Sequence, residues 1–128
     1  MRAPSGRAAR LAADSAAVPA FINARTDLFL SAAAERHDDQ LVNDALQRAQ
    51  AYADAGANGF FVPGLVDERL IARVCDASPL PVNIMVLPAA PTATRMAELG
   101  VARISHGPGP YLRMMRSLEE AARQVYAV

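Results

Sequence analysis

The sequence predicts an α/β protein built around a parallel sheet. Short, mostly apolar segments bounded by glycine and proline alternate with longer segments whose apolar residues recur every three or four positions. Such alternation is typical of parallel strands joined by helical crossovers. A doubly wound sheet needs about this length, whereas an eight-fold barrel needs roughly 250 residues, twice the 128 present. Length alone therefore favours the doubly wound sheet.

Four segments have the character of buried strands. Each is short and mostly apolar, which is the pattern of parallel strands covered on both faces. We expect the strands at residues 19–27, 59–62, 81–87 and 101–105. The fourth strand runs into a Gly-Pro-Gly-Pro segment at residues 107–110.

Helices are expected before the first strand and after every strand. Asp67 is placed to cap the third of them, and either Thr92 or Thr94 begins the fourth. In the last helix we expect the apolar stripe that begins at Leu112 to face inward. The expected helices span residues 5–16, 39–55, 68–76, 92 or 94 to 99, and 111–127.

Composition excludes several classes of function. The 13 basic residues, all arginine, balance 13 acidic residues, so no net field draws nucleic acid or an anionic membrane. With no lysine, a Schiff-base lysine and a phosphate-loop lysine are both absent. Cys75 alone permits neither an intrachain disulfide nor a multi-cysteine metal site. No apolar run approaches a membrane span and no secretory signal is evident, so we expect a cytoplasmic protein.

The first strand carries the strongest chemical signal. Alternation places Asn23, Arg25 and Asp27 on one face of this strand. A lone buried charge costs several kcal/mol, so these charged groups either pair with one another or bind something. In the second case, Arg25 would be a fork for a carboxylate or an enolate oxygen.

Two further polar residues follow or interrupt later strands. Asn83 interrupts an apolar strand, so its amide either ties the strand to a loop or touches a ligand. Arg113 lies one turn into the last helix, whose first amides could point at an anion. Pro108 and Pro110 lack N–H donors there. The chain displays no Asp-x-Asp pair and no Ser/His/Asp elbow, hence no self-sufficient catalytic set.

Several strings resemble the isocitrate lyase/phosphoenolpyruvate mutase superfamily. The resemblance covers the chain from about residue 7 to residue 124 and is greatest to the small bacterial members often labelled phosphonomutases. The strings that carry it are FINARTD at 21–27, RAQAYADAGA at 48–57, FVPG at 61–64, PLPVN at 79–83 and LGVARIS at 99–105.

The resemblance implies a different architecture from the one that length favours. Members form a (β/α)8 barrel, and the four strands here resemble its fifth to eighth. The chain, residues 1–128, would then be a single partial domain: a C-terminal half-barrel with an N-terminal helix and four βα units. Members bind Mg²⁺ and a 2-oxo acid or its enolate, and make or break a C–C or P–C bond beside it.

The resemblance also implies roles for particular residues. Arg25 matches the arginine that contacts the substrate carboxylate or enolate oxygen, and Asp27 matches the acidic position after it; we expect both to be catalytic. Asn83 and, more loosely, Arg113 match substrate-binding positions. The family's serine-glycine turn, its Asp-rich metal ligands and its catalytic-cysteine loop lie in the first half and have no counterpart here. Cys75 is not that cysteine, and no residue of this chain is expected to ligate the metal.

Three hypotheses for function follow. In the first, the chain is a truncated Mg²⁺-dependent lyase or phosphonomutase, inactive alone, which forms homo-oligomers by exchanging its terminal helix between subunits. In the second, it is a non-catalytic α/β binding or assembly module that keeps only an anion clamp. A doubly wound binding domain unrelated to the family is a third. None of them involves nucleic acid or a membrane.

Overall fold

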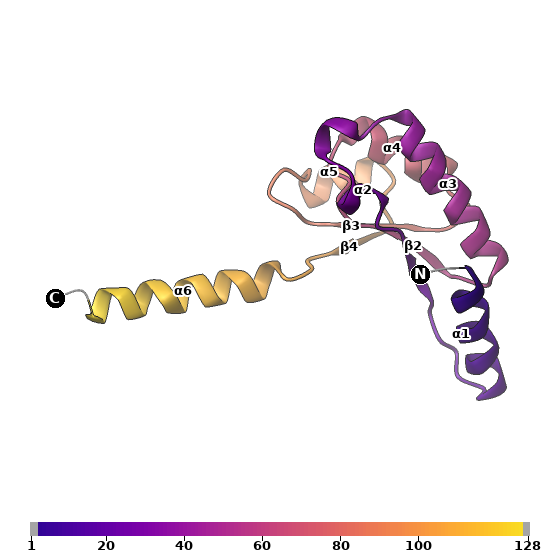
Figure 1. Ribbon diagram of the computed structural model, residues 1–128, viewed down its shortest axis with the longest axis horizontal. Helices are drawn as coiled ribbons and strands as arrows, with labels where there is room; N and C mark the ends of the chain where they lie inside the picture. Colours follow the sequence, from indigo (N-terminus) through magenta and orange to yellow (C-terminus); the bar gives the residue numbers. More distant parts are fainter. Residues whose placement is uncertain (1–2, 127–128) are drawn as a thin grey trace.

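The fold is a parallel sheet with helices packed on one side of it (Figure 1), and the computed structural model describes residues 3–126. The order of elements is an N-terminal helix followed by four βα units, with α2 and the 3-10 turn η1, which were not expected, between β1 and α3. The elements are α1 (Ala3–Ser15), β1 (Asn23–Arg25), α2 (Leu28–Ser31), η1 (Ala34–Arg36), α3 (Asp39–Asp54), β2 (Gly59–Val62), α4 (Glu68–Ala77), β3 (Val82–Met85), α5 (Ala93–Glu98), β4 (Arg103–Ser105) and α6 (Gly109–Tyr126).

The strands follow one another across the sheet in chain order. β1 pairs with β2, β2 with β3, and β3 with β4, each pair parallel. A helix lies between each strand and the next, as parallel neighbours require. The predicted parallel sheet with helical crossovers is therefore confirmed.

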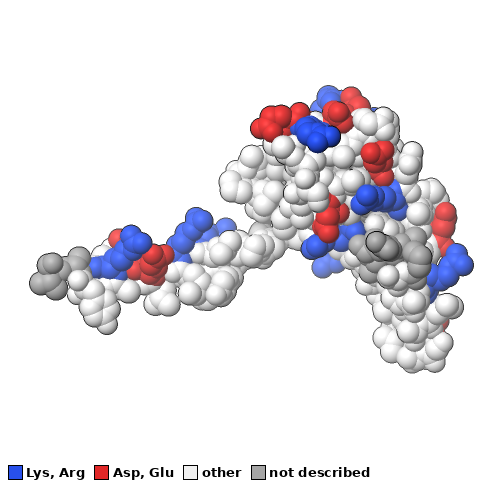
Figure 2. Space-filling view, viewed as in Figure 1, with Lys and Arg blue, Asp and Glu red and all other residues white. Residues whose placement is uncertain are grey.

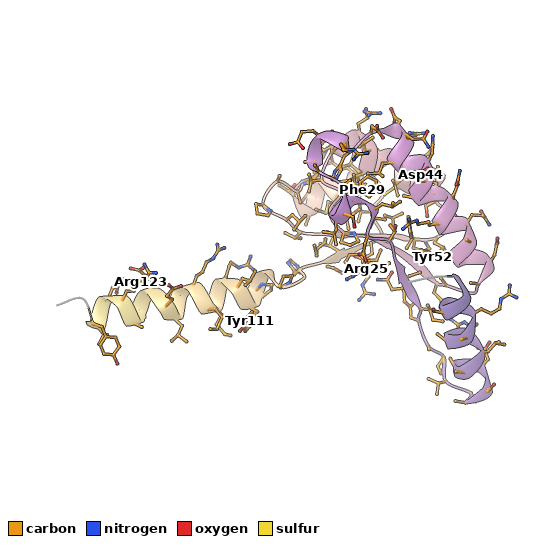
Figure 3. All side chains as sticks on the ribbon, in the orientation of Figure 1. Arg25, Phe29, Asp44, Tyr52, Tyr111 and Arg123 are labelled. Atoms are coloured by element: carbon orange, nitrogen blue, oxygen red, sulfur yellow. The ribbon has the colours of Figure 1, made fainter. Side chains whose placement is uncertain are left out.

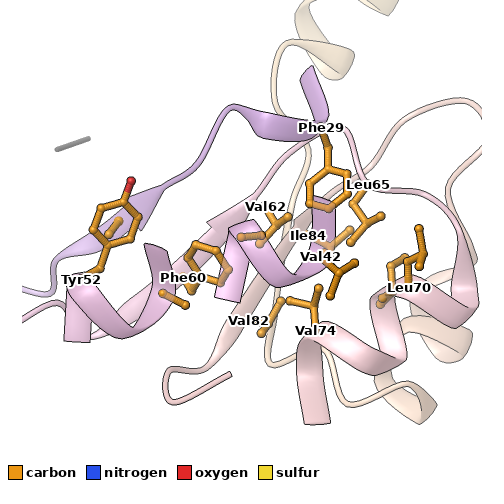
Figure 4. Packing of buried hydrophobic residues seen from close by; sticks show 14 of the residues in the cluster. Phe29, Val42, Tyr52, Phe60, Val62, Leu65, Leu70, Val74, Val82 and Ile84 are labelled. Atoms are coloured by element: carbon orange, nitrogen blue, oxygen red, sulfur yellow. The ribbon is translucent and has the colours of Figure 1, made fainter. Parts of the chain in front are cut away.

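One face of the sheet forms the hydrophobic core. Phe60, Val62 and Ile84 are fully buried there, against residues such as Val42 of α3 and Val74 of α4 (Figure 4). In Figure 1 the helices α3, α4 and α5 lie on this same side of the sheet. Burial of these side chains supplies most of the favourable free energy of folding.

The opposite face has no helical layer among the described residues. It carries a row of side chains that are side by side in the strand register: Arg25, Phe61, Asn83 and Arg103. The two arginines are exposed. A doubly wound sheet needs helices on both faces, so the prediction from length alone is wrong. It failed because the number of residues does not show how many faces of a sheet helices cover.

The strand ends are staggered as in a barrel. The row just described starts at the last residue of β1, Arg25, and ends at the first residue of β4, Arg103. Strands of an eight-stranded barrel with a shear of 8 are tilted and shift by about one residue per strand. The sheet has this sense of stagger, and the fold is an α/β half of a (β/α)8 barrel.

Side-chain caps fix where two of the predicted helices begin. Asp67 Oδ1 accepts a hydrogen bond from Leu70 N over 2.9 Å, which confirms Asp67 as the cap of α4. Thr92 Oγ1 accepts one from Arg95 N over 3.2 Å, so Thr92 rather than Thr94 precedes α5. Each cap contributes about 1 kcal/mol to stability.

Helix α1 is fastened to the sheet by one guanidinium. Arg10 Nε donates to the Gly56 carbonyl over 3.1 Å, and Arg10 Nη2 donates to the Ala20 carbonyl over 2.9 Å and to Asn58 Oδ1. Asn58 Oδ1 also accepts from the backbone N–H of Ile22 over 3.0 Å. Arg10 thus joins α1 to the segments that lead into β1 and β2.

Helix α6 projects away from the rest of the chain (Figure 1). Contrary to the prediction that its apolar stripe faces inward, α6 buries no residue, and Leu118 is 63% exposed. Basic and acidic side chains run along one edge of the helix and uncharged surface along the other (Figure 2). Within residues 3–126, no helix is long and apolar enough to cross a membrane.

We predict that Gly64→Ala destabilises the fold by about 3 kcal/mol, measured by urea unfolding. Gly64 has a φ of +95°, and a Cβ there would lie 2.7 Å from the backbone carbonyl of Phe29. The matched control is Gly109→Ala, because the nearest atom to its new Cβ is Arg113 Nη1 at 3.9 Å. Equal unfolding midpoints for the two variants would contradict the prediction.

Candidate functional site

The candidate site lies where β1 ends, on the uncovered face of the sheet. Arg25 Nε lies 2.9 Å from Asp27 Oδ1, and Arg25 Nη2 donates to Asp27 Oδ2 over 3.2 Å. The mutual ion pair, one of the two expectations for these residues, is therefore present. Asp27 Oδ1 is buried, and although Nε is close, no hydrogen bond of good geometry reaches it. This oxygen keeps its capacity to accept a hydrogen bond.

Asp27 pairs with Arg25 and does not cap the following helix α2 with its side chain. It occupies the N-cap position of α2, but its side chain makes no capping hydrogen bond. Aspartates at such positions usually accept a hydrogen bond from the first turn, as Asp67 does for α4. The Asp27 carboxylate instead faces Arg25 and fixes the direction of its guanidinium.

Helix α3 holds this strand end from the core side (Figure 3). The Tyr52 hydroxyl donates to the Arg25 carbonyl over 3.4 Å, and Arg48 Nη1 donates to Thr26 Oγ1 over 3.3 Å. Burial raises the pKa of Tyr52 above its ordinary value; Arg48 opposes this rise and Asp27 adds to it. The hydroxyl therefore stays protonated and remains a donor to the strand.

Asn83 lies inside β3 rather than at its end. It is the second of the four residues of this strand and is buried. Asn83 Nδ2 donates to Ser105 Oγ over 3.0 Å, and Ser105 Oγ donates to Asn83 Oδ1 over 3.1 Å. The amide thus ties β3 to β4, whereas the sequence predicted a tie to a loop or a ligand. Its contact with a substrate stays a prediction.

The predicted site residues do not share one pocket in the described chain. Arg25 ends β1, and Asn83 lies two strands away. Arg113 lies on α6, beyond β4, where it lines a cavity with Val86 and Leu87. Strands lie about 4.8 Å apart, so β1 and β4 are separated by about 14 Å. The substrate-binding role of Arg113 also stays a prediction.

The sequence analysis did not single out two polar residues on the uncovered face of the sheet. Arg103 lies beside Asn83 in the register, and Ser105 is the hydrogen-bond partner of Asn83. The available signal was the alternation of Arg103, Ile104 and Ser105, which puts both polar side chains on the face opposite Ile104.

Comparison with known proteins identifies the family. The profile of phosphoenolpyruvate phosphomutase matches residues 3–126. This chain belongs to the phosphoenolpyruvate phosphomutase family. Among relatives, 2-methylisocitrate lyase from Salmonella typhimurium is 34% identical over 122 residues, which cover 93% of this chain.

Solved structures of the phosphoenolpyruvate mutase/isocitrate lyase superfamily share the fold. A protein assigned as a phosphonomutase from Burkholderia cenocepacia is 55% identical, with a TM-score of 0.93 over 95% of this chain. The crystal structure of 2,3-dimethylmalate lyase, at 23% identity and a TM-score of 0.69, shows the same fold over 96% of the chain. The resemblance expected from the sequence is confirmed.

The chain spans about half of these relatives or less. It covers 38% of the length of the lyase, 49% of the phosphonomutase and 43% of 2,3-dimethylmalate lyase. These fractions agree with half of an eight-stranded barrel.

The described residues of this family member do not form a magnesium-binding site by themselves. Within residues 3–126, no group of three or more His, Cys, Asp or Glu side chains is placed to hold a metal. Cys75 lies on α4, and burial raises the pKa of its thiol to about 11. Its thiol therefore stays protonated at neutral pH, as for a small core residue.

We predict that Ser105→Ala lowers the free energy of unfolding by about 1–3 kcal/mol, because it leaves the buried Asn83 amide without its partner. Urea unfolding measures the change. Ser117→Ala, on the exposed side of α6, is the control and should cause no loss. Equal stability of the two variants would show that the Asn83–Ser105 pair is not structural.

Proposed function

We propose that this chain is the C-terminal half of a Mg²⁺-dependent lyase or mutase that acts on a C–C or P–C bond beside a 2-oxo acid or its enolate. One observation carries the proposal: the Arg25 guanidinium, oriented by Asp27, stands at the carboxyl end of a strand on the uncovered face. Active sites of (β/α)8 barrels form at that end. The names of the relatives, a 2-methylisocitrate lyase and an assigned phosphonomutase, support this class of substrate.

The chemistry of the pair suits an enolate. A guanidinium donates charge-assisted hydrogen bonds to a carboxylate or an enolate oxygen. As negative charge develops on that oxygen, these bonds strengthen, so the transition state is stabilised more than the substrate. Asp27 keeps Arg25 in position, because its carboxylate lies against the guanidinium.

We infer that this half is inactive alone. Within the described chain, β1 and β4 are the edges of an open sheet, and the face bearing Arg25, Asn83 and Arg103 lacks the opposing strands of a barrel. The magnesium ligands that the family implies would come from outside the described residues. Residues 1–128 would then form a partial domain that needs four more strands to close the site.

We further propose that subunits associate through α6 as homo-oligomers in the cytoplasm. The helix exposes an apolar side with Tyr111, Met115, Leu118 and Val125, and burial of such a side favours association. Exchange of the terminal helix between copies would cover it.

A second candidate is a non-catalytic binding or assembly module. The observation that favours it is the Arg25–Asp27 pair itself, because an anion clamp needs no metal site and none is formed within residues 3–126. Such a module would bind a small carboxylate without converting it.

We predict that Arg25→Ala weakens oxalate binding about tenfold or more, measured by calorimetry, since one charge-assisted clamp is lost. Arg7→Ala, on the exposed surface of α1, is the matched control and should bind as the wild type does. With Mg²⁺, the chain alone should not turn over oxaloacetate, methylisocitrate or phosphonopyruvate. Unchanged affinity in Arg25→Ala would remove Arg25 from the site, and turnover would refute inactivity.

Co-expression with the first half of the Burkholderia phosphonomutase separates the two candidates. A half-enzyme should form a complex that turns over one of these substrates, with the activity lost in Arg25→Ala. A module should bind oxalate and show no turnover in the same complex.

We predict that Leu118→Glu reduces association, because it places a charge in the centre of the apolar side of α6. Sedimentation at micromolar concentrations should show a smaller species than for the wild type. Arg123→Glu changes the opposite side of the helix, where Arg123 pairs with Glu119, and should associate as the wild type does. A compact wild-type monomer at these concentrations would contradict the proposal.

A further inference from the structure

The sheet has two open edges, β1 and β4, on either side of its uncovered face. Within residues 3–126, no strand pairs with the outer side of β1 or of β4. An open edge leaves backbone N–H and C=O groups without a strand to pair with, and proteins normally cover or close such edges. Each edge can therefore accept a further parallel strand.

The stagger of the four strands is half of the stagger in a closed barrel. The register runs in one row from Arg25, the last residue of β1, to Arg103, the first residue of β4. An eight-stranded barrel shifts by about one residue per strand and about eight residues in all. A second set of these same four strands would complete that shift.

The two edges match residue by residue. Across four strands the row shifts by about four residues, so beyond Arg103 it reaches the residue four positions before Arg25, which is Phe21. Phe21 lies on the uncovered face, because a Cβ added to Gly59 would lie 3.1 Å from its ring. Phe21 is 61% exposed and Arg103 is also exposed. A guanidinium beside an aromatic ring is a favourable pair.

The same register keeps the apolar residues of both edges on the core side. It places Ile22 of one copy beside Ile104 of the other. Ile22 is buried, and Ile104 packs against the core of its own sheet. A shift of one residue would bring side chains from opposite faces together, so the alternation of the two strands favours this pairing.

The inward-facing side chains also fit two copies. A barrel packs them in layers of four that come from alternate strands. With a shift of one residue per strand, Asn23 of β1 lies level with Asn83 of β3, and Phe61 of β2 lies level with Ser105 of β4. One copy supplies two side chains to each of these layers, and two copies supply all four.

Charge does not oppose this pairing. Arg25 ends β1 and Arg103 begins β4, so their guanidiniums lie toward opposite mouths of the barrel, where water reaches them. Asp27 pairs with Arg25 over 2.9 Å. The layers between the mouths hold neutral side chains.

We propose that a second copy of this chain closes the barrel, with β4 of each copy pairing with β1 of the other about a two-fold axis. The inference rests on the half-barrel of the proposed function and names the partner that covers the face bearing Arg25. Without the second copy the site is incomplete, because half of the barrel interior beneath Arg25 comes from that copy. The contact uses strand edges, whereas association through α6 uses the apolar side of that helix.

Cysteine cross-linking of the full chain tests the proposal, in a Cys75→Ala background. The two thiols of Phe21→Cys/Arg103→Cys lie three strands apart within one copy, and about 5 Å apart at their Cα atoms between copies. A disulfide joins Cα atoms about 4.4–6.8 Å apart. After oxidation we expect about tenfold or more covalent dimer than for Arg7→Cys/Arg103→Cys, a control in which both positions are exposed.

Two further variants extend the test. Asn23→Cys/Ser105→Cys, the next pair in the same register, should cross-link as well. Leu118→Glu removes the contact through α6 and leaves the strand edges intact, so it should sediment as a dimer at micromolar concentrations. This last measurement does not depend on how the cysteine variants fold.

Failure of this inference and failure of the proposed function give different results. Cross-linking no greater than in the control would overturn the inference, and so would a monomeric Leu118→Glu. In either case, weaker oxalate binding by Arg25→Ala would leave the proposed function standing. Cross-linking of both register pairs, together with unchanged oxalate affinity in Arg25→Ala, would support the second copy and contradict the proposed role of Arg25.

Discussion

In the part of the chain that the structure describes, the helices cover one face of the sheet, and the rest of the structure depends on this constraint. Parallel strands are normally buried on both faces, and here the core side meets that need with residues such as Phe60 and Ile84. The other side presents Arg25, Asn83 and Arg103, which cannot form an apolar core. Such a face suits the carboxyl-end side of a barrel, where active sites form. The stagger of the strand ends points to the same architecture.

At the end of β1, contacts from Asp27 and from α3 fix the position of Arg25 on this face. Asp27 could have capped α2, yet its carboxylate faces Arg25 and leaves the cap unmade. Tyr52 and Arg48 reach from α3 to the backbone of Arg25 and the side chain of Thr26. The strand end is thus held from the core side while the guanidinium faces the open side. Loss of a cap costs about 1 kcal/mol, a cost compatible with a functional site.

Local patterns in the sequence were sufficient for the strands, the crossover helices and the Asp67 cap, because each depends on neighbouring residues. The pairing of Asn83 with Ser105 could not be predicted, since it depends on the register of β3 against β4. The doubly wound sheet that the length favoured was wrong, because length does not show how many faces of the sheet helices cover. Likewise, the stripe that begins at Leu112 reads as a core-facing pattern, but a periodic pattern does not say which chain covers it.

Helix α6 must satisfy two different surroundings at once. Its polar side meets the apolar segment after β3 and leaves Arg113 and Arg116 over the cavity, while its apolar side faces solvent. Leu112, at the border of the two sides, is 46% exposed. Because α6 projects from the sheet and buries no residue, the described part of the chain does not cover its apolar side, which is left for contact with another surface.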